Sequence, residues 1–381
     1  MTINGLTFRT GLQVAALAAV GTLSLAACGG GTPGGSESSA AGNQESTGGA
    51  LTCPAGSLTA EGSSAQQNAF EEVAAMYAEA CGQKATINYN PTGSGAGIKS
   101  FYNGQADFAG SDSALKSEEK DGVVETEKAK ERCAGNEAWN LPMVVGPVAF
   151  AFNVDGVDDL VVNAEVLAKI FNGSITTWND PAIAALNSGA SLPADKITVF
   201  FRSDESGTTE NVTKFLKAAG HGKWTKEPGK AWTGTGEGKN KSSGVAEAVK
   251  STKNSISYME WSYAADNSLK ISKLDNGSGP VELTGENVAT AVSAAEVSGT
   301  GNDLQLKIDY TTKEADAYPA LLVTYEIVCS KGLDAEKTAV LKDFLTYFAS
   351  PDTQKALEDI GYAPLPTELA TKVTAAVAAV S

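Results

Sequence analysis

The stretch that decides the fold is LPMVVGPVAFAFN, residues 141–153, a nearly uninterrupted run of apolar residues. A run of this length without alternation is typical of a strand that is buried on both faces. A second such run, YPALLVTYEIVC, occupies residues 318–329. We expect both strands to lie in the core and to cross between two lobes, where they form a hinge.

Helical and extended patterns alternate around these two runs. ITVFF (197–201) has the composition of a strand, and TTENVTKFL (208–216) places its apolar residues on one helical face. Further helices are predicted at 65–80, capped by Ser63 or Ser64, and at 334–349 and 351–360, which close the chain. Alternation of this kind, in a chain of 381 residues, predicts a two-lobed α/β fold with mixed sheets flanked by helices.

The chain is acidic, with 29 basic and 45 acidic residues and a net charge of −16 at pH 7. This charge argues against nucleic acid or an anionic lipid surface as the main partner. An anion site in such a protein must be built from local dipoles and hydrogen bonds, because the global field opposes an incoming anion.

The N-terminus, residues 1–27, is predicted to be an export signal that is too short in its apolar run to span a bilayer. It ends in LAAC, residues 25–28, which resembles a bacterial lipoprotein signal and implies cleavage before Cys28 and a lipid on that cysteine. The alternative is an ordinary signal peptide with an unrelated cysteine. Residues 28–56 are rich in glycine and serine, so we expect a disordered tether with a reach of roughly 30 Å.

Four further cysteines, Cys53, Cys81, Cys133 and Cys329, make an even number in a chain predicted to be exported. Two disulfides are therefore expected. The sequence leaves three pairings open, and we favour Cys53 with Cys81 and Cys133 with Cys329. The spacings do not resemble a metal site and the chain has one histidine, so no metal or cofactor is predicted.

Three loops place hydroxyl groups and glycines where a helix is predicted to begin. The first is SGT (206–208), four residues after Arg202, where helix N–H groups, hydroxyls and a guanidinium can meet an oxyanion. The alternative is a plain capped helix with Arg202 in a surface ion pair to Asp204 or Glu205. GSG (93–95) and SS (63–64) are the other two loops. GSG matches neither the dinucleotide nor the nucleotide P-loop pattern, and the loop TGTGEGKNKS (233–242) also fails the P-loop pattern.

Asp112 is an unusual member of an anion site, because an ionised carboxylate only accepts hydrogen bonds. It repels an anion unless the ligand brings a proton, which phosphate does near neutral pH and sulfate does not. One aspartate would thus exclude sulfate. The alternative is that Asp112 caps a turn.

Taken together, these residues resemble the phosphate-binding lipoproteins of high-affinity phosphate ABC importers. The resemblance rests on TGSGAG (92–97), AGSD (109–112), RSDESGT (202–208) and IFNGSITTWNDPAIAALN (170–187). It implies a hinged, two-lobed fold of the type II periplasmic binding proteins, with lobe I from 57–143 and 320–381 and lobe II from 144–319.

The resemblance also implies the ligand-contacting residues. They are Ser64, Ala65, Ser94, Asp112, Arg202, Ser206, Gly207 and Thr208. Two positions depart from the family pattern: Ala65, one of these eight, replaces the usual aromatic residue, and Glu205 replaces a glycine beside the anion.

The predicted function is capture of inorganic phosphate outside the cell by a monomer that the lipid holds at the membrane, and delivery to the permease subunits of an ABC transporter. Two other functions remain open. The same fold could bind another oxyanion, such as sulfate, molybdate or a phosphonate. A secreted hydrolase is disfavoured, because the single histidine lies in a polar loop and no nucleophile motif occurs.

Overall fold

The computed structural model of the chain describes residues 51–381. The predicted signal 1–27, Cys28 and the predicted tether as far as residue 50 lie outside the described residues. Within 51–381, every helix is too short or too polar to cross a bilayer.

The main sheet of the described residues has eight strands in the order β2-β1-β3-β14-β4-β8-β6-β7, and β9 pairs with β4 as the ninth. The bounds of these strands are β1 (Gly56–Gly62), β2 (Ala85–Asn90), β3 (Phe108–Ser111), β4 (Ala138–Asn153), β6 (Thr198–Arg202), β7 (Glu237–Lys239), β8 (Ser255–Glu260), β9 (Lys270–Ile271) and β14 (Leu321–Cys329). Parallel and antiparallel pairs both occur, so the sheet is mixed as predicted.

Strand β4 is the long strand that joins the two halves of this sheet. It pairs with β14 as far as Pro147 and with β8 from Val148 onward. Residues 140–152 are all buried, which confirms the prediction of a core strand from the apolar run. The exchange of partners falls four residues beyond the predicted lobe boundary at 143, and the lobe boundaries stay a prediction.

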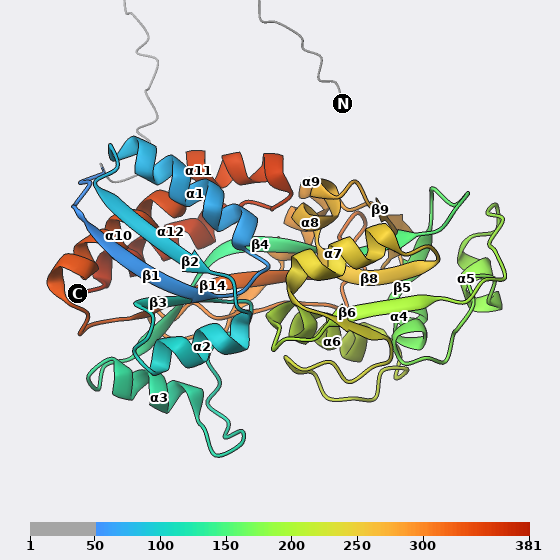
Figure 1. Cartoon of the computed structure of the whole chain (residues 1–381), viewed down its shortest axis with the longest axis horizontal. Helices are drawn as coiled ribbons and strands as arrows, with labels where there is room; N and C mark the ends of the chain where they lie inside the picture. The colour runs from blue at the N-terminus through green and yellow to red at the C-terminus, as the bar shows by residue number, and fades with distance from the viewer. Residues whose placement is uncertain (1–50) are drawn as a thin grey trace, which may run out of the picture. The chain divides into compact units, whose positions relative to one another are not determined.

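The N-terminal and C-terminal segments lie side by side on one side of this exchange (Figure 1). Phe70 of α1 and Phe344 of α10 have ring centroids 5.4 Å apart, and Phe108 of β3 lies next to both. The helices of this half are α1 (Gln67–Ala80), α2 (Ser94–Tyr102), α3 (Glu125–Arg132), α10 (Ala335–Phe348), α11 (Pro351–Ala356), η1 (Leu357–Ile360) and α12 (Thr367–Ala379).

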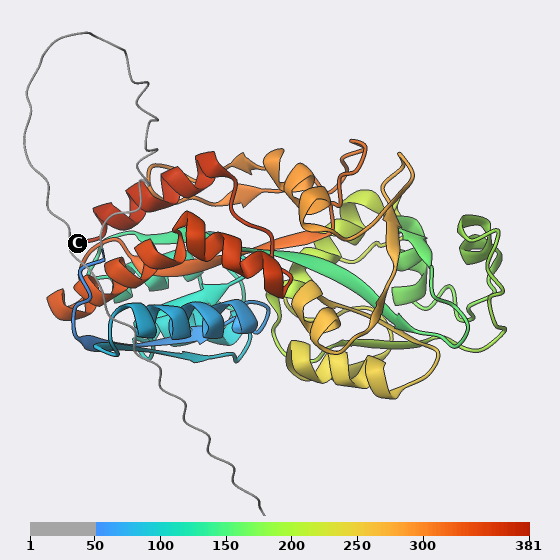
Figure 2. The same ribbon diagram turned by 90° about the horizontal axis from the view of Figure 1, so that it is seen from above.

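The middle of the chain forms the other half, as the view in Figure 2 also shows. Its core contains Phe150 of β4, whose ring centroid lies 5.9 Å from that of Phe215. The helices are α4 (Ala164–Phe171), α5 (Pro181–Leu186), α6 (Gly207–Ala219), α7 (Lys241–Ser251), α8 (Trp261–Asp266) and α9 (Gly285–Ser293). Small sheets are formed by β5 (Val161–Asn163), β10 (Lys273–Asp275) and β11 (Pro280–Val281), and by β12 (Glu296–Val297) and β13 (Leu306–Lys307).

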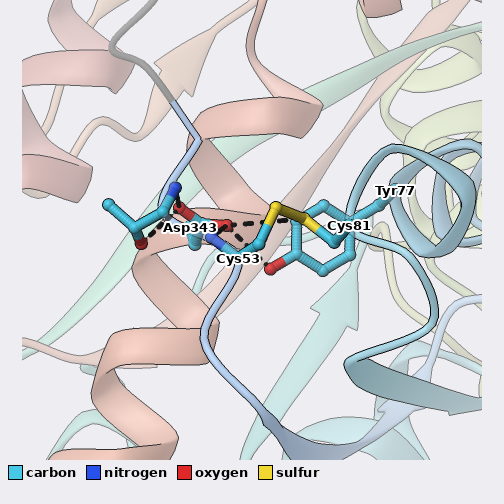
Figure 3. Close-up of a disulfide and its surroundings, with 5 residues drawn as sticks. Cys53, Tyr77, Cys81 and Asp343 are labelled. Carbon is cyan, nitrogen blue, oxygen red and sulfur yellow. Dashed lines mark hydrogen bonds between the residues drawn. A yellow bond between two sulfur atoms is a disulfide. The ribbon is translucent and has the colours of Figure 1, made fainter.

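Both predicted disulfides are present, Cys53–Cys81 and Cys133–Cys329. Figure 3 shows the first of them beside Asp343 of α10. The Asp343 carboxylate accepts hydrogen bonds from the backbone N–H groups of Thr52 and Cys53 and from the hydroxyl of Tyr77, at 2.7, 3.1 and 2.9 Å. These bonds and the disulfide fix residues 52–53 to the folded body, so the structure differs from the expectation of a disordered tether that extends to residue 56.

We expect removal of the Cys133–Cys329 disulfide to destabilise the protein more than removal of the Cys53–Cys81 disulfide. The first links residues 196 apart and the second residues 28 apart, and a longer loop loses more chain entropy when it is closed. Replacing Cys133 and Cys329 together with alanine should lower the free energy of unfolding by about 2–5 kcal/mol. Urea unfolding of both double variants measures this, and a larger loss for the short loop would contradict the expectation.

Candidate anion-binding site

The N-terminus of α6 carries three of the predicted site residues. Ser206 is the N-cap, and its hydroxyl accepts a hydrogen bond from the N–H of Thr209 at 3.1 Å. Gly207 and Thr208 form the first turn, where backbone N–H groups lack partners within the helix and the helix dipole is positive. The sequence order of strand, SGT turn and helix therefore produces the predicted geometry.

Gly207 lies directly against the other half of the molecule. A Cβ atom at this position would lie 2.5 Å from Ser94 Oγ and 2.6 Å from the Cβ of Asp112. Real Cβ contacts are never this short, so only glycine fits. The α6 N-terminus is thus in contact with the two predicted site residues that follow β2 and β3.

Arg202 ends strand β6 and is 2% exposed. Its Nε donates to Asp204 Oδ1 at 2.8 Å, and its Nη2 donates to Asp204 Oδ2. Its Nη1 donates to Ser242 Oγ at 2.9 Å. Burial alone would lower the pKa of Arg202 and raise that of Asp204. The attraction between the two charges outweighs burial, so the pKa of Arg202 is raised and the pKa of Asp204 is lowered. The pairing with Asp204 was one of the two alternatives from sequence, and it is a buried pair rather than a surface one.

Asp112 is 3% exposed and accepts hydrogen bonds from three hydroxyl groups. Ser63 and Ser94 donate to Oδ2 at 2.7 and 3.1 Å, and Thr324 of β14 donates to Oδ1 at 2.7 Å. Burial raises the pKa of Asp112 to about 6, against the lowering effect of these hydrogen bonds. The carboxyl group is therefore mostly ionised at neutral pH and acts as an acceptor.

The loop before α1 supplies Ser64 and Ala65, both buried. Ser64 Oγ lies 3.0 Å from Ser242 Oγ and accepts from the Ser242 N–H at 3.2 Å. The Ala65 N–H donates to Ser63 Oγ at 3.0 Å. The predicted serine cap of α1 is wrong: Gln66 is the N-cap without a side-chain hydrogen bond, because Ser63 and Ser64 bond to Asp112 and Ser242 instead.

All eight predicted site residues therefore lie in one buried region where the two halves meet. Four further residues complete it, and each makes a hydrogen bond to one of these eight. They are Ser63, which belongs to the predicted loop 63–64, and Ser242, Glu260 and Thr324, which were not predicted. Ser242 is the last residue of the loop 233–242, which was compared only with a nucleotide-binding pattern. The signal used for the other loops, a hydroxyl at the start of a predicted helix, is present there as well.

Glu205 lies at the edge of this region and does not enter it. Its carboxylate pairs with Lys99 of α2, and its backbone oxygen accepts from the Gly95 N–H at 3.0 Å. Its side chain is 48% exposed. The negative charge that replaces the glycine of the family motif is thus neutralised by a lysine of the other half.

Glu326 of β14 is a buried acid behind Asp112. It pairs in the sheet with Gly110, and neither of its carboxyl oxygens has a hydrogen-bond partner among the described residues. Burial, together with the negative charge of Asp112, raises the pKa of Glu326 to about 8. Glu326 is therefore mostly neutral at pH 7 in the folded protein.

We expect this acid to make the ligand-free protein less stable as pH rises from 6 to 8. Glu326 releases its proton near pH 4.5 in the unfolded chain, whereas the folded protein holds this proton up to about pH 8. The contribution of Glu326 to the free energy of unfolding therefore falls by up to about 1.4 kcal/mol per pH unit in this range. Glu326→Gln should remove that loss. Urea unfolding of both proteins at pH 6, 7 and 8 measures the difference, and parallel pH profiles would contradict the expectation.

The comparisons with known proteins agree with this fold. Residues 38–352 match the family model of the PBP superfamily domain, which defines the class of the protein. The phosphate-binding proteins PstS2 and PstS3 of Mycobacterium bovis (strain BCG / Pasteur 1173P2) are 42% and 43% identical to the chain. The alignments cover 98% of this chain and 99% of each relative. The chain therefore belongs to the phosphate-binding proteins of this superfamily.

Solved structures support the same fold. A high affinity periplasmic phosphate-binding protein, PfluDING, solved with bound phosphate, superposes with a TM-score of 0.68 at 23% sequence identity. The superposition covers 84% of this chain and 93% of that structure. The type II, two-lobed periplasmic binding fold predicted from the sequence is confirmed.

Proposed function

We propose that the chain captures inorganic phosphate between its two halves and delivers it to the permease of a phosphate ABC transporter. The observation that carries the proposal is that groups able to donate hydrogen bonds to an anion and a carboxylate able to accept one lie in the same buried region. Arg202 and the α6 N-terminus offer positive charge and N–H donors, and Asp112 offers an acceptor. A solute-binding protein performs no chemistry on its ligand, so the chain is not an enzyme.

Each predicted residue has a role in this proposal. Arg202 supplies the main cation, and Gly207 and Thr208 supply backbone N–H groups. Ser64, Ala65, Ser94 and Ser206 line the same space. Asp112 accepts the hydrogen of monohydrogen phosphate, which gives selectivity against sulfate.

The ligand would be released when the halves separate about β4 and β14. Lobe I would comprise 57–143 and 320–381, and lobe II 144–319. In the closed arrangement described here, Lys99 and Glu205 are one of the ion pairs that join the halves. Removal of water around the anion on closure strengthens its hydrogen bonds.

We also propose that the protein is exported and held at the cell membrane. The signal 1–27 would direct export, a lipid on Cys28 would hold the protein at the outer face of the cell membrane, and the glycine- and serine-rich segment would act as tether. The site is built within one chain, so we propose that the protein acts as a monomer. The alternative ligands are sulfate, molybdate or a phosphonate, and the titrations with sulfate test the first of them.

The transport role is tested by uptake of radioactive phosphate in cells whose only phosphate-binding protein is this chain. We expect uptake at low external phosphate with the natural chain and little uptake with Arg202→Ala produced at the same level. Equal uptake with both proteins would overturn the proposal.

A further inference from the structure

A second carboxylate, Glu260, lies beside the proposed phosphate site. Glu260 is the last residue of β8 and is 0% exposed. Its Oε1 accepts a hydrogen bond from the Thr208 hydroxyl at 2.6 Å. Its Oε2 has no hydrogen-bond partner within residues 51–381. Its neighbour across the sheet is Val148 of β4, which offers no charge.

This hydrogen bond determines whether the Thr208 hydroxyl can donate a hydrogen bond to a ligand. A hydroxyl group has one hydrogen, and that of Thr208 is directed to Glu260. Arg202 Nη1 is 3.4 Å from the same hydroxyl and donates to it. Toward a bound anion, Thr208 Oγ1 therefore presents only lone pairs, so its side chain acts as an acceptor and not as the donor expected from sequence.

The charged side chains around the site also disfavour a ligand with two negative charges. The buried or largely buried charged side chains are one cation, Arg202, and the three carboxylates of Asp112, Asp204 and Glu260. With all three carboxylates ionised, the formal sum is −2. The N-termini of α1, α2, α6 and α7 add roughly half a positive charge each, which offsets this sum but leaves nothing to balance a phosphate dianion.

We propose that Glu260 makes this protein bind phosphate together with a second proton, so that the bound ligand is equivalent to dihydrogen phosphate. One ligand hydroxyl donates to Asp112, and the other donates to Thr208 or to the unpartnered oxygen of Glu260. This inference rests on the proposed function and adds a proton requirement to it.

Among the titratable groups around the site, Glu326 behind Asp112 has a pKa of about 8 and can exchange protons in the alkaline range, whereas the others keep one charge state. Arg202 is fixed by Asp204, which is ionised since its pKa is lowered. The pKa of Asp112 is about 6, so Asp112 is ionised in the alkaline range. Burial raises the pKa of Tyr263 and Tyr362, which keeps both tyrosines neutral.

The test is calorimetric titration of the ligand-free protein with inorganic phosphate at pH 8.5, in two buffers with different ionisation enthalpies. Free phosphate is then nearly all dianion, since its second ionisation lies at roughly 6 to 7. The natural protein should take up close to one proton for each phosphate bound. Glu260→Gln should take up close to none, because its amide can donate to Thr208 and free that hydroxyl to donate. Glu205→Gln is the matched control and should take up as many protons as the natural protein. Glu326→Gln should do the same, which excludes the buried acid behind Asp112 as the source of the uptake.

Proton uptake near zero in the natural protein, or equal uptake in Glu260→Gln, would overturn the inference. If Glu260→Gln does not fold, the natural protein alone provides the test. Its dissociation constant for phosphate should rise about tenfold per pH unit between pH 8 and 9. A dissociation constant that does not change with pH in this range contradicts the inference. Absence of phosphate binding in the natural protein would instead overturn the proposed function, so the two failures are distinguishable.

Discussion

Arg202→Ala is expected to weaken phosphate binding by about 100-fold or more. The guanidinium is 2% exposed and is the one buried cation among the described residues of the site. Its loss leaves a buried anion and the Asp204 carboxylate without their partner, which costs about 3 kcal/mol or more. Titration of both proteins with phosphate at pH 7 measures the ratio.

The matched control for this variant is Lys239→Ala. Lys239 lies opposite Arg202 in the neighbouring strand β7, but it pairs with Glu237 near the surface. This variant should bind phosphate within about twofold of the natural protein, because surface pairs contribute little. If Arg202→Ala bound phosphate as tightly as Lys239→Ala, the assignment of the site would be wrong.

Asp112→Asn should lower the preference for phosphate over sulfate by about 100-fold or more. In the natural protein, a fully ionised sulfate oxygen faces a carboxylate, and like charges in contact cost several kcal/mol. The amide of asparagine can donate to sulfate instead. The hydroxyls of Ser63, Ser94 and Thr324 can rotate to suit the amide, so the loop keeps its hydrogen bonds.

The ratio of the phosphate and sulfate association constants at pH 7.5 measures this effect. Asp121→Asn is the control, because Asp121 is exposed and its positive φ of 53° suits asparagine equally well. The control should keep the natural ratio. An unchanged ratio in Asp112→Asn would remove the selectivity role of Asp112, although the protein would still bind phosphate.

The elements with strong local patterns could be predicted from the sequence. The apolar run of β4 and the one-sided pattern of α6 each gave the correct element, because burial on two faces or on one leaves a distinct periodicity. The run SISYMEWSYA (255–264) has the composition of one strand along its whole length, but the strand β8 ends at Glu260 and α8 follows. Helix α12 was missed altogether. Its buried residues Leu369, Val373, Ala376 and Val377 follow helical spacing, and Glu368 and Lys372 lie on its polar face, so the helical pattern was present in the sequence.

The candidate site was predictable only where its signal was local. The hydroxyls and glycines at helix starts identified Ser94 and 206–208, and the family resemblance joined them. Thr324 and Glu260 reach the site from strands that are distant in the sequence, so no spacing relates them to Asp112 and Thr208. Only the sheet order, which places β14 beside β3 and β8 beside β6, brings them together.

The central claim is that this chain binds phosphate selectively in the region between Arg202 and Asp112. Calorimetric titration of the ligand-free protein with phosphate and with sulfate at neutral pH tests it most directly. The account predicts tight one-to-one binding of phosphate and no heat from sulfate. No phosphate heat from a folded protein, or equal binding of sulfate, would contradict it.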